Sequence, residues 1–85
     1  MNKKEYKASD IEKAVLDSYF STRQPVFQDL THTVEEKKTT LQIQDDLLPT
    51  LKIEDSVIVD YMILSGYLLV QDDDGSPIWQ MWRMR

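Results

Sequence analysis

The stretch EDSVIVDYMILSGYLLVQDDDGSPIWQMWR, residues 54–83, decides the fold. Its first part, residues 54–65, begins with acids that suit the positive end of a helix dipole and continues with apolar residues over more than half of the helix circumference. Gly66 follows as a natural C-terminal cap. Two apolar runs, 67–71 and 78–83, flank an Asp-Gly turn, which is the strongest short signal for a β-hairpin. The sequence therefore predicts a largely buried helix followed directly by a hairpin.

A second helix is predicted near the N-terminus. Ser9 and Glu12 have the spacing of a capping box, in which each side chain accepts a hydrogen bond from the other residue's backbone N–H. Apolar residues then recur at helical spacing as far as Thr22, and Pro25 marks the exit of the chain. We expect an amphipathic helix over about residues 10–22.

Residues 23–44 allow two interpretations. The charged run over 35–38 favours the solvent side of a helix, whereas the alternation in Thr39–Gln44 is typical of a strand. We expect either a hairpin-like excursion, or a helix followed by a short strand at Thr39–Gln44.

A short helix is expected between this segment and the C-terminal one. Asp45 and Asp46 can cap it, and Pro49 is tolerated in its first turn. It ends near Leu51, and a tight turn at 52–53 leads into the next helix.

Composition limits the classes of protein to consider. The chain has 85 residues, 41% of them hydrophobic and 29% charged, which suits one globular domain. It has no cysteine, so a disulfide framework and a thiolate zinc site are excluded. The longest apolar run, 57–70, is interrupted and too short to span a bilayer, and the polar N-terminus predicts no signal peptide. We therefore expect a cytoplasmic protein.

A capped helix, two short helices joined by a tight turn, and a β-hairpin follow one another over about residues 9–83. This order resembles the winged helix-turn-helix superfamily, although the stretch 23–44 is longer than the minimal family pattern. The resemblance implies an α+β fold, a small winged-helix-like domain of three helices plus a C-terminal β-hairpin. We expect this single domain over 9–85, preceded by a basic flexible tail over 1–8.

DNA-binding members of that superfamily place the longer helix in the major groove and touch the backbone with the wing. Here the helix would present Glu54, Asp55 and Asp60, and the wing tip carries Asp72–Asp74. Residues 45–60 hold five acids and one lysine, a net charge of −4 within a chain of −5. These carboxylates would repel phosphates, so the resemblance in fold does not predict the usual groove-reading mode.

A narrower resemblance concerns winged helices that bind left-handed duplexes. Those proteins use a Tyr on the third helix and a Pro-x-Trp on the wing, and Tyr61, Pro77 and Trp79 have a similar spacing. The Asn that the family places one turn before its Tyr falls at Val57, and the flanking basic residues are missing. An aromatic packed under a wing tryptophan is more often part of the core.

No residue pattern predicts catalysis or a metal site. His32 is the only histidine, and no serine or lysine has the partners of an activated nucleophile. Aligning Gly75 with the glycine of a calcium loop puts Val70 and Met81 where carboxylate ligands are required. We therefore expect no enzyme, no cofactor and no metal.

The last strand, predicted over 78–83, is apolar on both faces. Trp79 and Met81 point to one side and Trp82 to the other. One interpretation places one tryptophan in the core and the other flat against the first helix. The alternative is an exposed Trp/Met surface for a protein partner, on a strand whose edge could pair with another chain.

Two functions follow as hypotheses. The first is a small acidic regulatory protein that acts by protein–protein contact, or as a homodimer, and inhibits a nucleic-acid-handling partner by imitating phosphate charge. Its contact residues would be Trp79, Met81, Trp82, Glu54, Asp55 and Asp60.

The second hypothesis is a dimeric DNA-binding transcriptional regulator of the winged-helix type. Its contacts would then come from the basic tail and the terminal arginines, namely Lys3, Lys4, Lys7, Arg83 and Arg85.

Overall fold

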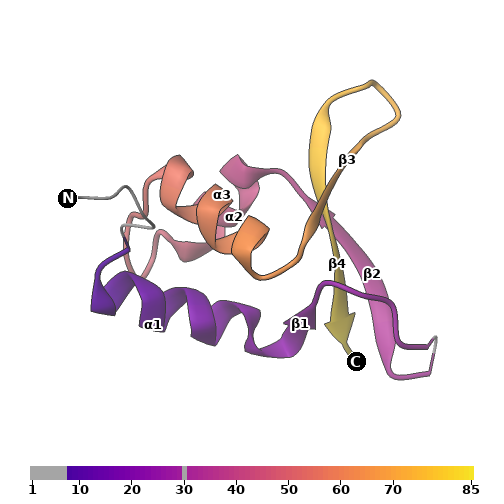
Figure 1. Ribbon diagram of the computed structural model, residues 1–85, viewed down its shortest axis with the longest axis horizontal. Coiled ribbons are helices and arrows are strands. Elements are labelled where there is room, and N and C mark those ends of the chain that lie inside the picture. Colours follow the sequence, from indigo (N-terminus) through magenta and orange to yellow (C-terminus); the bar gives the residue numbers. More distant parts are fainter. Residues whose placement is uncertain (1–7, 30) are drawn as a thin grey trace.

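The computed structural model describes residues 8–29 and 31–85. Its elements are α1 (Asp10–Tyr19), the 3-10 helix η1 (Phe20–Thr22), β1 (Arg23–Gln24), β2 (Thr33–Lys38), α2 (Thr40–Leu47), α3 (Asp55–Leu64), β3 (Leu68–Gln71) and β4 (Pro77–Met84). The three α-helices lie toward one end of the long axis and the sheet toward the other, with the β3–β4 hairpin extending away from the helices (Figure 1). The α+β class and the three helices are as expected, but two of the four strands precede α2, so the sheet is not confined to the C-terminus.

Strand β4 is the centre of an antiparallel sheet. β2 pairs with it from Thr33 opposite Met84 to Lys38 opposite Trp79. Because β2 occupies one edge of β4, the other two strands pair with its opposite edge. β3 lies along the first half of β4 and β1 along the second half. The expectation that the C-terminal strand offers an edge to another chain is therefore wrong, and the outer strands are β2 on one side and β1 and β3 on the other.

The first helix begins as the sequence predicts. The Ser9 hydroxyl accepts from the Glu12 N–H at 3.1 Å, and the Glu12 carboxylate accepts from the Ser9 N–H at 2.9 Å. The α-helix ends at Tyr19 and continues as one 3-10 turn to Thr22, which matches the expected exit.

The strand expected at Thr39–Gln44 is wrong. Thr39 is the N-cap of α2, its hydroxyl accepting from the Gln42 N–H at 3.1 Å while the Gln42 side chain accepts from the Thr39 N–H at 2.8 Å. Ile43 is fully buried and Leu41 is exposed, which fits one helix face and not a strand. The strand of this region is β2, which contains the charged run that one of the two interpretations placed on a helix.

The expected cap at Asp45-Asp46 is also wrong, because both residues lie in the last turn of α2. The carboxylate of Asp46 accepts from Lys38 Nζ and from the Tyr19 hydroxyl, each at 2.6 Å. These donors compensate an acid at the negative end of a helix dipole. Asp46 thereby connects α1, β2 and α2.

The core lies between the helices and one face of β4. Leu16 of α1, Ile43 of α2 and Ile53 of the connecting turn are fully buried with Met81 of β4. Ten buried side chains form this cluster: Leu16, Phe20, Ile43, Leu47, Ile53, Ile58, Met62, Tyr67, Trp79 and Met81. The hairpin itself is closed as predicted, with positive φ at Gly75, and Gly66 ends the turn after α3 with a φ of 91°.

Helix α3 is less buried than its composition predicts. Ile58 and Met62, one turn apart, are inaccessible to solvent, whereas Ile63 is 59% and Leu64 71% exposed. The expectation of a largely buried helix is therefore wrong, because α3 packs on one side only.

The second tryptophan lies away from the first helix. Trp82 is half-buried on the opposite face of the sheet, where its ring meets Phe27 edge-on with 4.9 Å between centroids. The loop after β1, and not the first helix as expected, therefore covers it. In the part of the chain that is described, no helix is long and apolar enough to cross a membrane.

The capping box at Thr39 can be tested by substitution. Thr39→Ala removes one partner of the helix N-terminus, and we expect the free energy of unfolding to fall by about 1 kcal/mol. Urea unfolding followed by circular dichroism measures this change. The exposed Thr22→Ala is the control and should have little effect; equal effects of the two substitutions would contradict a capping role.

Candidate functional site

The outer side of α3 combines acidic and large apolar side chains. Asp60 lies three and four residues before Ile63 and Leu64, so the three share one helix face. All three are exposed. Glu54 and Asp55, at the start of the helix, are exposed as well, and neither they nor Asp60 form an ion pair within the described ranges.

The tip of the β3–β4 hairpin, which we label the wing, is a second acidic surface. Residues 71–77 are all exposed, and the turn is closed by the Asp72 N–H, which donates to the Ser76 carbonyl at 2.8 Å. The Asp74 carboxylate accepts from the Ser76 N–H at 2.9 Å, and this hydrogen bond lowers the pKa of Asp74. The turn therefore holds Asp74 in its charged form.

Apolar side chains connect the two acidic surfaces along the chain. After Ile63 and Leu64 come Leu68 and Leu69 of β3, which are 59% and 53% exposed and, as neighbours in a strand, point to opposite faces of the sheet. Pro25 Cγ lies 3.9 Å from the position that a Cβ atom would occupy at Gly66. The loop after β1 therefore borders the turn between α3 and β3. We call the exposed residues of this region, from Glu54 through α3 and β3 to Asp74, the α3–wing face.

Two of the expected contact residues belong to the core. Trp79 is 2% exposed and donates from Nε1 to Thr40 Oγ1 at 2.9 Å, and Met81 is fully buried. Neither can contact a partner in this conformation, so the expected Trp/Met surface is reduced to Trp82. Sequence reasoning missed Ile63 and Leu64, although their spacing from Asp60 placed them on the polar side of the helix.

The expected basic contacts are dispersed or outside the described residues. Arg83 Nε lies 3.8 Å from Glu36 Oε2, and the Arg85 N–H donates to the His32 carbonyl at 2.9 Å. Arg83 lies near the end of β4 and Arg85 follows the strand. The tail residues Lys3, Lys4 and Lys7 lie outside the described residues.

Tyr61 faces the first helix. Its hydroxyl donates to Asp17 at 2.6 Å and its ring stacks on Phe20 with 5.3 Å between centroids. The hydrogen bonds from Tyr61 and then Lys13 lower the pKa of Asp17. Trp79 donates a hydrogen bond to Thr40 of α2. Both aromatic residues thus have packing roles, which account for the Tyr61–Trp79 spacing that resembled winged helices that bind left-handed duplexes.

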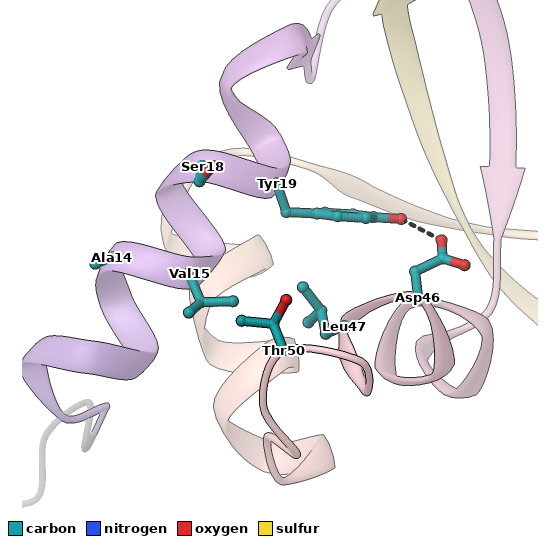
Figure 2. A pocket seen from close by; sticks show the side chains of 7 residues that line it. All are labelled: Ala14, Val15, Ser18, Tyr19, Asp46, Leu47 and Thr50. Atoms are coloured by element: carbon teal, nitrogen blue, oxygen red, sulfur yellow. Dashed lines mark hydrogen bonds between the residues drawn. The ribbon is translucent and has the colours of Figure 1, made fainter.

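A surface groove of about 360 Å³ lies between α1 and the end of α2 (Figure 2). The Tyr19 ring extends across it toward Asp46, whose carboxylate accepts a hydrogen bond from the Tyr19 hydroxyl (Figure 2). Burial and this hydrogen bond raise the pKa of Tyr19 above its ordinary value. The groove is lined by Ala14, Val15, Ser18, Tyr19, Asp46, Leu47 and Thr50. Its single carboxylate already has two donors, so the groove offers an apolar recess and no general base.

Within the described ranges, no group of three or more histidine, cysteine, aspartate or glutamate side chains is arranged to hold a metal ion. His32 is exposed and its Nδ1 lies 3.0 Å from an Asp29 carboxylate oxygen, within one turn of chain. This pair orders the loop before β2.

The chain matches no protein-family model, no curated protein and no solved structure. The charge and exposure of the α3–wing face are therefore the observations that bear on function.

The different burial of the two tryptophans predicts different fluorescence. In Trp82→Phe the remaining Trp79 is shielded by the core, so we expect blue-shifted emission and weak quenching by iodide. In Trp79→Phe the remaining Trp82 is only half-buried, beside Phe27, and quenching should be stronger. Equal quenching in the two folded variants would contradict this arrangement.

The Asp46 cluster predicts a dependence of stability on pH. Partial burial pushes the pKa of Asp46 upward, but the hydrogen bonds from Lys38 and Tyr19 outweigh it and lower the pKa. A carboxyl with a lowered folded-state pKa stabilises the fold above its unfolded pKa of about 4, and this contribution is lost as the pH falls through the folded value. We therefore expect Asp46→Asn to be less stable than wild type at pH 7, with a shallower loss of stability on acidification.

Urea titrations at a series of pH values between about 7 and 2 measure this difference. Asp45→Asn removes a carboxylate from the same helical turn and serves as the matched control. Parallel stability curves for Asp46→Asn and wild type would contradict the role of Asp46.

Proposed function

We propose that the chain is a small winged-helix-like regulatory protein that acts by protein–protein contact through the α3–wing face. The observation that carries the proposal is the outer side of α3, where Asp60 lies beside the exposed side chains of Ile63 and Leu64. The sequence of α1, α2, α3 and a β3–β4 hairpin supports the winged-helix comparison, with α3 in the place of the groove-reading helix.

Charge disfavours DNA as the ligand of this face. No lysine or arginine occurs between Glu54 and Trp82, so neither α3 nor the wing can neutralise a phosphate. Phosphate contacts and the release of their counterions supply much of the affinity of DNA-binding proteins, and an acidic face loses both. Each carboxylate near the duplex adds repulsion instead.

The apolar residues favour a protein partner. Fully burying an Ile or Leu side chain contributes about 1.5–3 kcal/mol, and two such side chains side by side can serve as the centre of an interface. Acids at both ends of the α3–wing face would then form its polar rim. A complementary partner presents an apolar centre bordered by basic residues, which is a surface found on proteins that handle nucleic acids.

This arrangement leads to inhibition by charge imitation. The carboxylates of α3 and of the wing would occupy the basic residues that the partner otherwise uses for phosphates. The chain would therefore compete with nucleic acid for the same surface, and it would need no catalytic group of its own.

The proposal predicts which substitutions abolish partner binding. Tagged wild-type chain is used to retain proteins from a lysate of the source organism, in parallel with Asp60→Lys and with Ile63→Ser/Leu64→Ser. We expect both variants to lose the retained partner by at least about tenfold, because each removes complementarity at the centre of the face. Leu41→Ser, a similar exposed change on α2, is the matched control and should retain it.

Competition and direct binding complete the test. Duplex DNA added to the wild-type complex should displace the partner if both use one basic surface. The proposal is wrong if the partner is retained equally by all variants. It is also wrong if the purified chain itself binds duplex DNA at about 0.1 M salt and this binding depends on Arg83 and Arg85.

A further inference from the structure

The edge of β2 that faces away from β4 carries no strand in the part of the chain that the structure describes. β2 is six residues long, and within the described ranges Val34–Lys38 make backbone hydrogen bonds to no element other than β4. In an antiparallel sheet, alternate residues of such a strand direct their N–H and C=O groups outward. These groups are a template for one more antiparallel strand.

We propose that this edge pairs with β2 of a second copy, antiparallel and about a two-fold axis at Glu36, so that one sheet continues through both copies. The surface differs from the α3–wing face. The proposal therefore stands or falls independently of the proposed function.

The charges of β2 are self-complementary in this register. An axis at Glu36 puts Glu35 opposite Lys37 of the second copy, and Lys37 opposite its Glu35. Both side chains lie on the same sheet face and are 42% exposed, with 4.0 Å between Lys37 Nζ and Glu35 Oε2 in one chain. Pairing would thus bring together four charges of alternating sign.

Neighbouring registers are less complementary. Moving the axis to Glu35 places that carboxylate opposite its own copy. Moving it to Lys37 places two ammonium groups opposite each other, and the Glu36–Lys38 pairs that it also creates join side chains already paired within the chain, Glu36 with Arg23 at 2.7 Å and Lys38 with Asp46 at 2.6 Å. Slipping by a single residue would exchange the two faces of the strand. Charged residues on an edge strand usually prevent it from pairing with other chains. The order Glu-Glu-Lys-Lys opposes pairing with an unrelated strand more than pairing with an antiparallel copy of itself, in which opposite charges meet.

The residue on the axis already has counter-charges. Glu36 would meet Glu36 of the second copy on the helix-facing side of the sheet. Its carboxylate is 2.7 Å from Arg23 Nε and 3.8 Å from Arg83 Nε, and its side chain is 17% exposed. The two arginines offset the repulsion between the paired glutamates.

Charge exchange tests the register. Glu35→Lys makes all four facing residues basic, and Lys37→Glu makes them all acidic. We expect each variant to dimerise at least about tenfold more weakly than wild type, because two attractive cross-strand pairs become repulsive. Glu35→Lys/Lys37→Glu restores opposite charges across the axis and should dimerise like wild type.

Sedimentation equilibrium of the full chain up to about 1 mM measures the association, and circular dichroism confirms folding of each variant. The two single variants change the net charge in opposite directions. If net charge alone governed association, one variant would strengthen it and the other would weaken it, and this result would overturn the proposal. A wild-type chain that stays monomeric throughout would overturn it as well.

Cysteine pairing locates the contact. The chain has no cysteine, so Glu35→Cys and Lys37→Cys each introduce a single thiol. Directly opposed residues bring their Cβ atoms to about 5 Å, near the distance that a disulfide needs, whereas diagonal neighbours are too far apart. Mild oxidation of the mixed variants should form the 35–37 disulfide faster than either variant forms its own dimer. Faster formation of a 35–35 or 37–37 disulfide would contradict the register.

Discussion

The rest of the structure depends on one constraint, which is that β4 pairs with other strands along both of its edges. Its residues pair with β2 on one side and with β3 and β1 on the other, and its inner face directs Trp79 and Met81 into the helices. Each helix supplies residues to the same cluster, including Leu16, Ile43 and Ile58. A domain of this size has few buried side chains to spare. The strand that closes the sheet must therefore also fill the core.

This dual role explains why the most aromatic segment leaves little of its apolar surface exposed. Two tryptophans on a terminal strand suggest a contact site when the strand is taken alone. In the structure one of them is required by the core and the other is covered by Phe27. The exposed apolar surface lies on α3 and β3. Helix α3 directs Ile58 and Met62 into the core and leaves Ile63 and Leu64 outside, and Leu68 of β3 is exposed as well.

Local signals predicted about half of the fold correctly. The capping box at Ser9, the glycine at Gly66 and the Asp-Gly turn each act within a few residues, so α1, the end of α3 and the hairpin follow from sequence. β2 could not be found in this way, because a strand with so few apolar residues is specified by its distant partner β4. The capping box formed by Thr39 and Gln42 could have been recognised from their spacing. The alternation of Leu41 and Ile43, which fits a helix and a strand equally well, favoured a strand instead.

The same limit applies to the candidate site. A helix that is apolar nearly all round has no preferred side in the sequence, so periodicity could not tell whether Met62 or Ile63 faces the core. The sequence does predict that Asp60 is exposed, because a carboxylate stays in contact with water whichever way the helix packs. Once Asp60 is outside, helical geometry requires Ile63 and Leu64 to be near it. The composite character of the α3–wing face, acidic with an apolar centre, thus follows from one charged position and the pitch of the helix, and this combination is the basis on which we propose a protein contact there.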